Sequence, residues 1–124
     1  MQVIQDSFLA GARAARGLAV IIDVFRAFSC TPLLFSLGIE KCMLVATPQE
    51  AFALKNERKD VVLMGESGGI PIEGFDLGNS PSEIRRLERS YFTGRTVVQR
   101  TSSGVQGALA ALEGAAEVMV AGYT

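Results

Sequence analysis

Apolar and polar positions along the chain form alternating blocks that predict strands separated by helices. Five short apolar runs are typical of strands in a parallel sheet, and they cover residues 18–22, 41–46, 61–64, 96–99 and 117–121. Turn and capping residues followed by spaced apolar positions lie between the runs and predict helices. Residues 1–124 are therefore predicted to form one three-layer α/β/α domain, with a mostly parallel sheet of about five strands.

The first apolar run, residues 18–22, is the uninterrupted sequence LAVII and is our candidate for the central strand of the sheet. It leads directly to Asp23 and Arg26. Pro32 predicts the first position of the next helix, because a first helical residue does not need the N–H that proline lacks. Residues 1–17 are weakly patterned and predict no function.

Two helices are predicted from capping boxes, in which a hydroxyl and a carboxylate three residues apart satisfy each other's backbone N–H groups. Thr47 and Glu50 form one such pair, with the Glu50 side chain expected to accept from the Thr47 N–H. Ser80 and Glu83 form the other pair. A further, alanine-rich helix is predicted over residues 105–112.

Residues 65–82 form a long segment that fits neither pattern, between a predicted strand and a predicted helix. Loops of this length in a compact domain usually have a function. The segment contains five glycines, which let backbone N–H groups approach a ligand, and three carboxylates, which can hold a hard cation. These carboxylates belong to Glu66, Glu73 and Asp76.

Polar side chains gather in the loops that follow three of the predicted strands, whereas the loop after the second strand is chemically plain. In a parallel sheet these loops meet at one edge, where open α/β folds bind ligands. We therefore predict a site at this edge. Its candidate residues are Asp23, Arg26 and Ser29, then Glu66, Glu73, Asp76, Asn79 and Ser80, and finally Thr101, Ser102 and Ser103.

This combination suits a phosphorylated substrate with Mg²⁺. Helix N-termini at Ser80 and Ser103 can present N–H groups to an anion, and Arg26 can make a bidentate contact with phosphate. Carboxylates can hold Mg²⁺, and a metal-bound water can then act as the nucleophile without histidine. Structural roles are the alternative: Asp23 can cap the following turn, Ser80 can be an N-cap, and Arg26 can neutralise Asp23.

Composition narrows the classes of function. A hydrophobic fraction of 48% and a net charge of −1 argue against nucleic-acid binding and disorder. Because the apolar runs are too short to cross a bilayer and no signal-peptide pattern is present, we expect a cytoplasmic protein. The absence of histidine excludes His-based triads and most zinc sites. Cys30 and Cys42 lack metal-ligand spacing and are expected to be reduced, buried thiols.

Other motifs of phosphate-binding and phosphatase enzymes are excluded, because the chain lacks their residues at the required spacing. Haloacid-dehalogenase phosphatases need a second Asp two residues after the nucleophilic one, and Phe25 stands at that distance from Asp23. A tyrosine-phosphatase loop needs an Arg six residues after its Cys, and Ser36 stands at that distance from Cys30. The chain has neither a Walker A run nor a G-x-G-x-x-G after a strand.

Two segments carry more specific motifs: IDVFRA at residues 22–27, and Gly65-Glu66 with Gly69 followed by GFDLGNSP at residues 74–81. They resemble the signatures of the 2-phosphosulfolactate phosphatase family. The resemblance extends from residue 18 onward and corresponds to the N-terminal half of longer family members. It implies an α/β/α, Mg²⁺-dependent hydrolase that removes phosphate from 2-phosphosulfolactate in coenzyme M synthesis.

The chain departs from the family pattern at residues 100–105, where RTSSGV replaces a motif resembling T-T-x-N-G-T. Two functions therefore stay open. The first is a Mg²⁺-dependent phosphatase of a small acidic phosphoester, and the second is a non-catalytic module that keeps the fold and anion binding without turnover. For the phosphatase we predict Asp23, Glu66 and Asp76 as catalytic and metal-binding residues, and Arg26, Asn79, Ser80, Thr101, Ser102 and Ser103 as substrate-binding residues.

Residues 117–121 predict an apolar strand with no helix after it to cover one face. Its central residues carry no charge that would prevent strand pairing at an open edge. We therefore expect a homodimer, or a larger even assembly, with this strand or the surface beside it in the interface.

Overall fold

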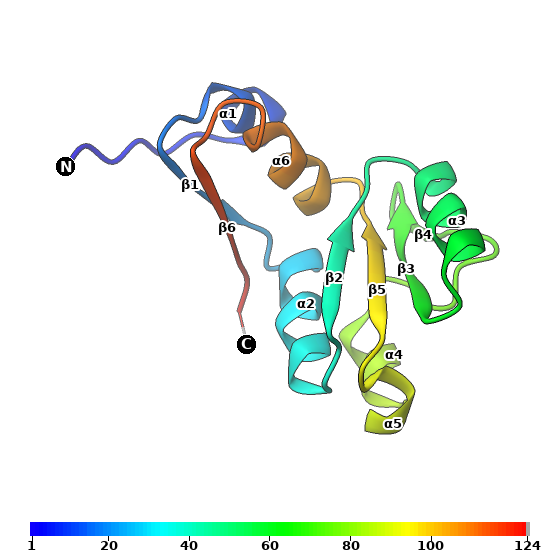
Figure 1. The fold of residues 1–124 in the computed structure, drawn as a ribbon. Coiled ribbons are helices and arrows are strands. Elements are labelled where there is room, and N and C mark those ends of the chain that lie inside the picture. The colour runs from blue at the N-terminus through cyan, green and yellow to red at the C-terminus, as the bar shows by residue number, and fades with distance from the viewer. Residues whose placement is uncertain (124) are drawn as a thin grey trace.

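The computed structural model describes residues 1–123, in which strands and helices alternate (Figure 1). The predicted α/β fold with mostly parallel strands is confirmed. No helix among these residues is long and apolar enough to span a membrane. In chain order the elements are α1 (Phe8–Ala14), β1 (Leu18–Ile22), α2 (Ala27–Ser36), β2 (Lys41–Leu44), α3 (Pro48–Glu57), β3 (Val61–Ser67), β4 (Ile70–Pro71), α4 (Pro81–Arg85), α5 (Arg89–Phe92), β5 (Thr96–Arg100), α6 (Gly104–Ala111) and β6 (Glu117–Ala121).

The strands divide into a four-stranded sheet, in the order β2-β5-β3-β4, and a separate two-stranded ribbon of β1 and β6. β2, β5 and β3 run parallel, and the short β4 runs antiparallel to β3. β1 and β6 are parallel to each other and lie to one side of the larger sheet (Figure 1).

The prediction that residues 18–22 form the central strand is wrong. Within the described chain β1 pairs with β6 alone, and β5 instead lies between two parallel strands, β2 and β3. An apolar run indicates that a strand has surface to bury, but it does not specify the partner strand. In β1 the alternate residues Leu18, Val20 and Ile22 are exposed, so only one face of the strand is covered.

Side-chain alternation along β3 builds the core on both faces of the larger sheet. Val62 and Met64 pack on one face with residues of α2, α4 and α5. Val61 and Leu63 pack on the other face with residues of α3. The β1–β6 ribbon has its own smaller core, in which Ala12, Ala19, Ala110 and Ala111 pack together.

Helix α2 begins at Ala27, so the prediction that Pro32 opens this helix is wrong. A turn forms before the proline because the Phe28 N–H donates to the carbonyl of Asp23 (3.2 Å) and the Cys30 N–H donates to the carbonyl of Arg26 (3.1 Å). Pro32 therefore lies inside the helix. The early start matters for the site, because it places residues 23–26 in a tight turn between β1 and α2.

The two predicted capping boxes form only in part. The Glu50 N–H donates to the Thr47 hydroxyl (3.2 Å), but the Glu50 carboxylate accepts from the N–H of Ala46 (3.0 Å), one residue earlier than expected. In the second box the Glu83 carboxylate accepts from the N–H of Gly78 (2.9 Å), while Ser80 makes no side-chain cap. Both carboxylates still satisfy a backbone donor just before their helix.

Candidate active site

The segment predicted as a long loop begins with a β-hairpin. β3 continues through Glu66 and Ser67, which pair with Pro71 and Ile70 of β4. Gly68 and Gly69 form the two-residue turn with φ values of 59° and 83°. Two successive positive φ values are the requirement of a type I′ hairpin turn, which explains the glycine pair. Glu66 therefore lies on a strand end rather than in a flexible loop.

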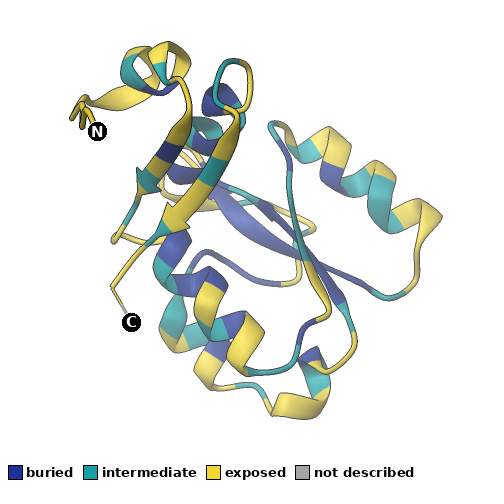
Figure 2. Cartoon of the chain, turned by 60° about the vertical axis from the view of Figure 1, so that its left-hand side comes forward, coloured by how far each residue is buried: buried dark blue, intermediate teal, exposed yellow. Residues whose placement is uncertain are grey.

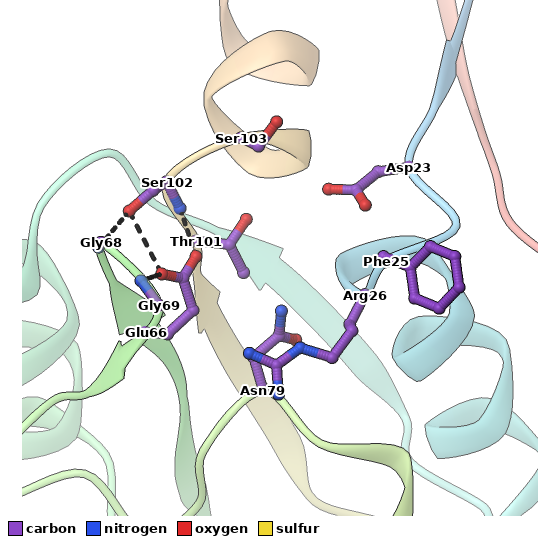
Figure 3. Close-up of a pocket in the computed structure, with 10 residues that line it drawn as sticks. All are labelled: Asp23, Phe25, Arg26, Glu66, Gly68, Gly69, Asn79, Thr101, Ser102 and Ser103. Atoms are coloured by element: carbon purple, nitrogen blue, oxygen red, sulfur yellow. Dashed lines mark hydrogen bonds between the residues drawn. The ribbon is translucent and has the colours of Figure 1, made fainter.

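The Glu66 carboxylate joins the hairpin to the loop after β5. It accepts from the N–H groups of Ser102 and Gly69, each at 2.6 Å, and from the Ser102 hydroxyl at 3.3 Å (Figure 3). The guanidinium of Arg100 donates to the backbone carbonyl of Glu66 at 2.8 Å. The Ser102 hydroxyl also accepts from the N–H of Gly68 at 2.8 Å. These contacts fix the relative positions of two crossovers.

Two opposing effects determine the pKa of Glu66. Burial of the carboxylate raises its pKa, but the hydrogen bonds from Ser102 and Gly69 and the positive charge of Arg100 together outweigh burial. The net effect is a pKa lowered from the ordinary value of 4.5. Glu66 is therefore an ionised, structurally engaged carboxylate in neutral solution.

Asp23 is held at the first turn of α6. Its Oδ2 accepts from the N–H of Gly104 at 2.9 Å, and the Thr101 hydroxyl accepts from the N–H of Val105 at 3.1 Å. Two backbone donors at this helix start are thus satisfied within the chain. Fewer free N–H groups therefore remain beside Ser103 for the predicted binding of phosphate, because the Asp23 carboxylate already occupies part of this positive helix end.

A cavity of about 250 Å³ opens between these groups (Figure 3). Asp23 borders it from the end of β1, Glu66 and Ser102 border it on another side, and Arg26 and Asn79 complete the polar lining (Figure 3). The lining consists of Asp23, Phe25, Arg26, Glu66, Gly68, Gly69, Asn79, Thr101, Ser102 and Ser103.

Asn79 carries an unsatisfied acceptor in this cavity. Its residue is 5% exposed, and its Oδ1 has no hydrogen-bond partner among residues 1–123. A buried polar atom without a partner costs about 1–3 kcal/mol, so proteins rarely retain one without a reason. Asn79 lines the cavity, but this oxygen itself is buried and has almost no surface open to it.

Seven of the nine residues predicted to act in the phosphatase line this cavity, and two do not. Asp76 accepts from the Lys55 ammonium (2.6 Å to Oδ1) and from the Leu63 N–H (2.7 Å to Oδ2), so its carboxylate ties the loop to β3 and α3. Ser80 bonds to the Ser82 hydroxyl (2.9 Å) and precedes a helix that begins with proline. The seven that line the cavity are Asp23, Arg26, Glu66, Asn79, Thr101, Ser102 and Ser103.

Sequence reasoning missed three residues that shape the site. Phe25 lines the cavity and is exposed. Arg100 positions Glu66 and Ser102, and the sequence signal was its place at the end of an apolar strand. Gln99 is fully buried, donates to the carbonyl of Ala27 (3.2 Å) and so anchors α2 to β5. The available sequence signal for Gln99 was a polar amide side chain in a strand of valines.

The predicted metal ligands do not converge as a trio. No group of three or more His, Cys, Asp or Glu side chains within residues 1–123 is arranged to hold a metal ion. The cavity is lined by the carboxylates of Asp23 and Glu66 and by Asn79, whose amide oxygen is buried. Mg²⁺ is commonly held by one or two carboxylates together with waters and substrate phosphate. Asp23 and Glu66 are therefore the carboxylates that would hold a Mg²⁺ ion in this cavity, and Asp76 lies outside it.

Comparison with known proteins identifies the family. The family model described as 2-phosphosulpholactate phosphatase matches residues 6–124. The chain is 40% identical over 111 residues to a probable 2-phosphosulfolactate phosphatase of Bacillus subtilis, a match that covers 90% of this chain and 47% of the relative. A protein of the same name from Deinococcus radiodurans is 38% identical over 84% of this chain and 42% of the relative.

The chain spans about half the length of the curated relatives that it matches. A third relative with this name, from Thermus thermophilus, shows the same relation, with 36% identity over 84% of this chain and 42% of the relative. On the extent of the family match, the chain belongs to the 2-phosphosulfolactate phosphatase family.

Proposed function

We propose that this chain forms the phosphate-binding pocket of a phosphatase acting on a small acidic phosphoester such as 2-phosphosulfolactate. The observation that carries the proposal is the cavity in which the side chains of Asp23, Arg26 and Asn79 converge. The names of the relatives support this substrate class.

The charge of the cavity supports a requirement for Mg²⁺. Its lining contains two carboxylates, Asp23 and Glu66, and one guanidinium, Arg26. A phosphate dianion entering such a lining meets no excess of positive charge, because Arg26 and the neighbouring Arg100 only balance the two carboxylates. A divalent cation supplies that excess, and when bound it also polarises the phosphoryl oxygen and activates water.

The chain's own residues have separate roles in this proposal. Arg26 binds a phosphoryl oxygen through its planar guanidinium. Asp23, held through one oxygen by Gly104 N–H, would hold the cation through its other oxygen. Asn79 lines the same cavity, where its amide would contact the substrate. Glu66 and Ser102 hold the hairpin and the loop after β5 in place around the substrate.

Phosphate release from a panel of phosphorylated 2-hydroxy acids, with and without Mg²⁺, tests the proposal. We expect Mg²⁺-dependent release by the wild-type chain and its loss in Asp23→Asn. Asp76→Asn is the matched control, because Asp76 is a carboxylate of the same motif region that lies outside the cavity. Wild-type activity in Asp23→Asn, or turnover independent of Mg²⁺, would contradict the assignment.

A non-catalytic module is the second candidate, and the departure of residues 100–105 from the family motif favours it. Such a module would bind phosphate or Mg²⁺ in the same cavity without turnover. Calorimetric titration beside the turnover assay separates the two candidates. Binding without phosphate release supports the module, whereas release supports the phosphatase.

A further inference from the structure

An amide side chain lies inside the core at Gln99 of β5, two residues before Thr101 of the cavity lining. Gln99 is fully buried, as is almost the whole of β5 (Figure 2). Its neighbours across the sheet, Leu44 of β2 and Met64 of β3, are apolar. Val97, on the same face of the strand, packs in the core with residues of α2. An apolar side chain would therefore suit position 99, and a buried amide there requires a reason.

Both ends of the Gln99 amide are hydrogen-bonded. Its Nε2 donates to the backbone carbonyl of Ala27 at 3.2 Å. Its Oε1 accepts from the Thr31 hydroxyl at 2.8 Å and from the Cys42 thiol at 3.6 Å. A carbonyl can only accept, so Ala27 determines which end of the amide is the donor. Because these groups are removed from water, each bond is costly to lose, and the amide holds the start of α2 against β5.

The start of α2 in turn holds the turn that carries two cavity residues. The carbonyl of Asp23 accepts from the N–H of Phe28 at 3.2 Å. The carbonyl of Arg26 accepts from the N–H of Cys30 at 3.1 Å. These bonds join residues 23–26 to the first turn of α2. Gln99 therefore fixes this turn relative to β5, whose following loop borders the same cavity.

The side chain of Arg26 has no carboxylate to hold it in place. Neither of the two ion pairs among residues 1–123 involves this residue. Arg26 is exposed, and its side chain extends from the start of α2 into the cavity (Figure 3). Its position in the cavity therefore depends on its backbone, and so on the bond between Gln99 and α2.

We infer that Gln99 is a positioning residue of the phosphate site, which acts through the carbonyl of Ala27 to set Arg26 against the loop after β5. The inference rests on the proposed function, because it takes Arg26 as the phosphate-binding group. A displacement of about 1 Å in a group that orients substrate can cost about 10²-fold in rate. An apolar residue at position 99 would fill the core but would leave α2 free to shift along β5.

Hydrogen exchange tests the anchoring without a ligand. Gln99→Met keeps the length of the side chain but removes its hydrogen bonds. Gln99→Asn is a second variant, which keeps an amide but is one methylene too short to reach Ala27. Thr31→Val is the matched control, because it removes a buried hydrogen bond to the same amide and leaves the bond to Ala27 in place.

The first turn of α2 should exchange selectively faster in both Gln99 variants. We expect the N–H groups of Phe28 and Cys30 to exchange about 10-fold or more faster than in Thr31→Val, relative to the amides of the buried strand β3 in the same variant. A residue that only adds stability would change both sets of amides alike. Unchanged relative exchange at Phe28 and Cys30 overturns the inference.

Calorimetric titration with inorganic phosphate in the presence of Mg²⁺ tests the consequence for the site. We expect Gln99→Met to bind phosphate about 10-fold or more weakly than the wild-type chain, and Thr31→Val to bind as the wild-type chain does. Equal affinity in Gln99→Met and Thr31→Val overturns the inference. A wild-type chain that binds no phosphate contradicts the proposed function instead, and the exchange rates then decide the role of Gln99 by themselves.

Discussion

The replacement Gly104→Ala tests how the start of α6 holds Asp23. A methyl group at this position would lie 2.5 Å from Oδ2 of Asp23 and 3.0 Å from the Cβ of Ala27. Ala27 is fully buried and cannot yield, so the Asp23 carboxylate must move. Its hydrogen bond from the Gly104 N–H, 2.9 Å long, is then lost.

The energetic effect follows from three contributions. Overpacking costs about 1–3 kcal/mol, and loss of the hydrogen bond costs about 1 kcal/mol. Removing a glycine from a helix returns up to about 1 kcal/mol. We expect a net loss of about 1–3 kcal/mol in the free energy of unfolding. Displacement of Asp23 should also lower phosphate release by on the order of 10²-fold.

Urea unfolding and the phosphate-release assay measure these two effects. Gly107→Ala is the matched control on the same helix, because its methyl group would meet only Ile21 Cγ2 at 3.4 Å, an ordinary contact. We expect Gly107→Ala to be neutral or to gain up to about 1 kcal/mol. If Gly104→Ala were as stable and as active as Gly107→Ala, the placement of Asp23 against α6 would be wrong.

Three further predictions concern the carboxylates and the thiols. Asp76→Ala should lower the free energy of unfolding by about 1–3 kcal/mol, because the Leu63 N–H loses its acceptor. Asp76→Asn keeps an oxygen at this position and should cost less, and urea unfolding midpoints compare the two variants. In the folded protein the pKa of Glu66 is lowered from its ordinary value of 4.5. The ionised carboxylate therefore stabilises the fold above pH 4.5, and this stabilisation is lost as the pH falls through the folded-state pKa. The difference in the free energy of unfolding between wild type and Glu66→Gln should shrink on acidification. Cys30 is buried, whereas Cys42, also predicted to be buried, is only partly buried. Burial raises the pKa of Cys30 to about 11 and of Cys42 to about 12, so both thiols should react with a thiol reagent at about pH 8 far more slowly in the native than in the denatured protein; equal rates in the two states would contradict their placement.

The sequence predicted the strands well because their apolar runs are local signals. All five predicted runs form strands, and the side chains of β3 alternate between the two faces of the sheet. Strand partners are a long-range property, and the pairing of β1 with β6 joins residues about a hundred positions apart. The continuous run at residues 18–22 therefore suggested a central strand that the structure does not have.

The gathering of the candidate side chains was predicted in outline, because parallel strands bring the segments that follow them to one edge. Asp23 follows β1, Glu66 lies near the end of β3 and Asn79 precedes α4, and all three line one cavity. Asp76 shares its motif with Asn79 but turns to Lys55 on α3, since side-chain direction in an irregular segment depends on tertiary neighbours. The unpartnered oxygen of Asn79 likewise could not be read from the sequence, because it depends on which donors the folded chain leaves nearby.

Calorimetric titration with 2-phosphosulfolactate in the presence of Mg²⁺ is the decisive experiment for phosphate binding in the cavity, because it reports on the cavity without requiring turnover. We predict one binding site per chain, dependent on Mg²⁺ and lost in Arg26→Ala, whose guanidinium lines the cavity. Arg85→Ala, at the C-terminal end of α4 and outside this cavity, should bind as wild type does. Binding that is absent in the wild-type chain, or equal in Arg26→Ala and Arg85→Ala, would contradict the account.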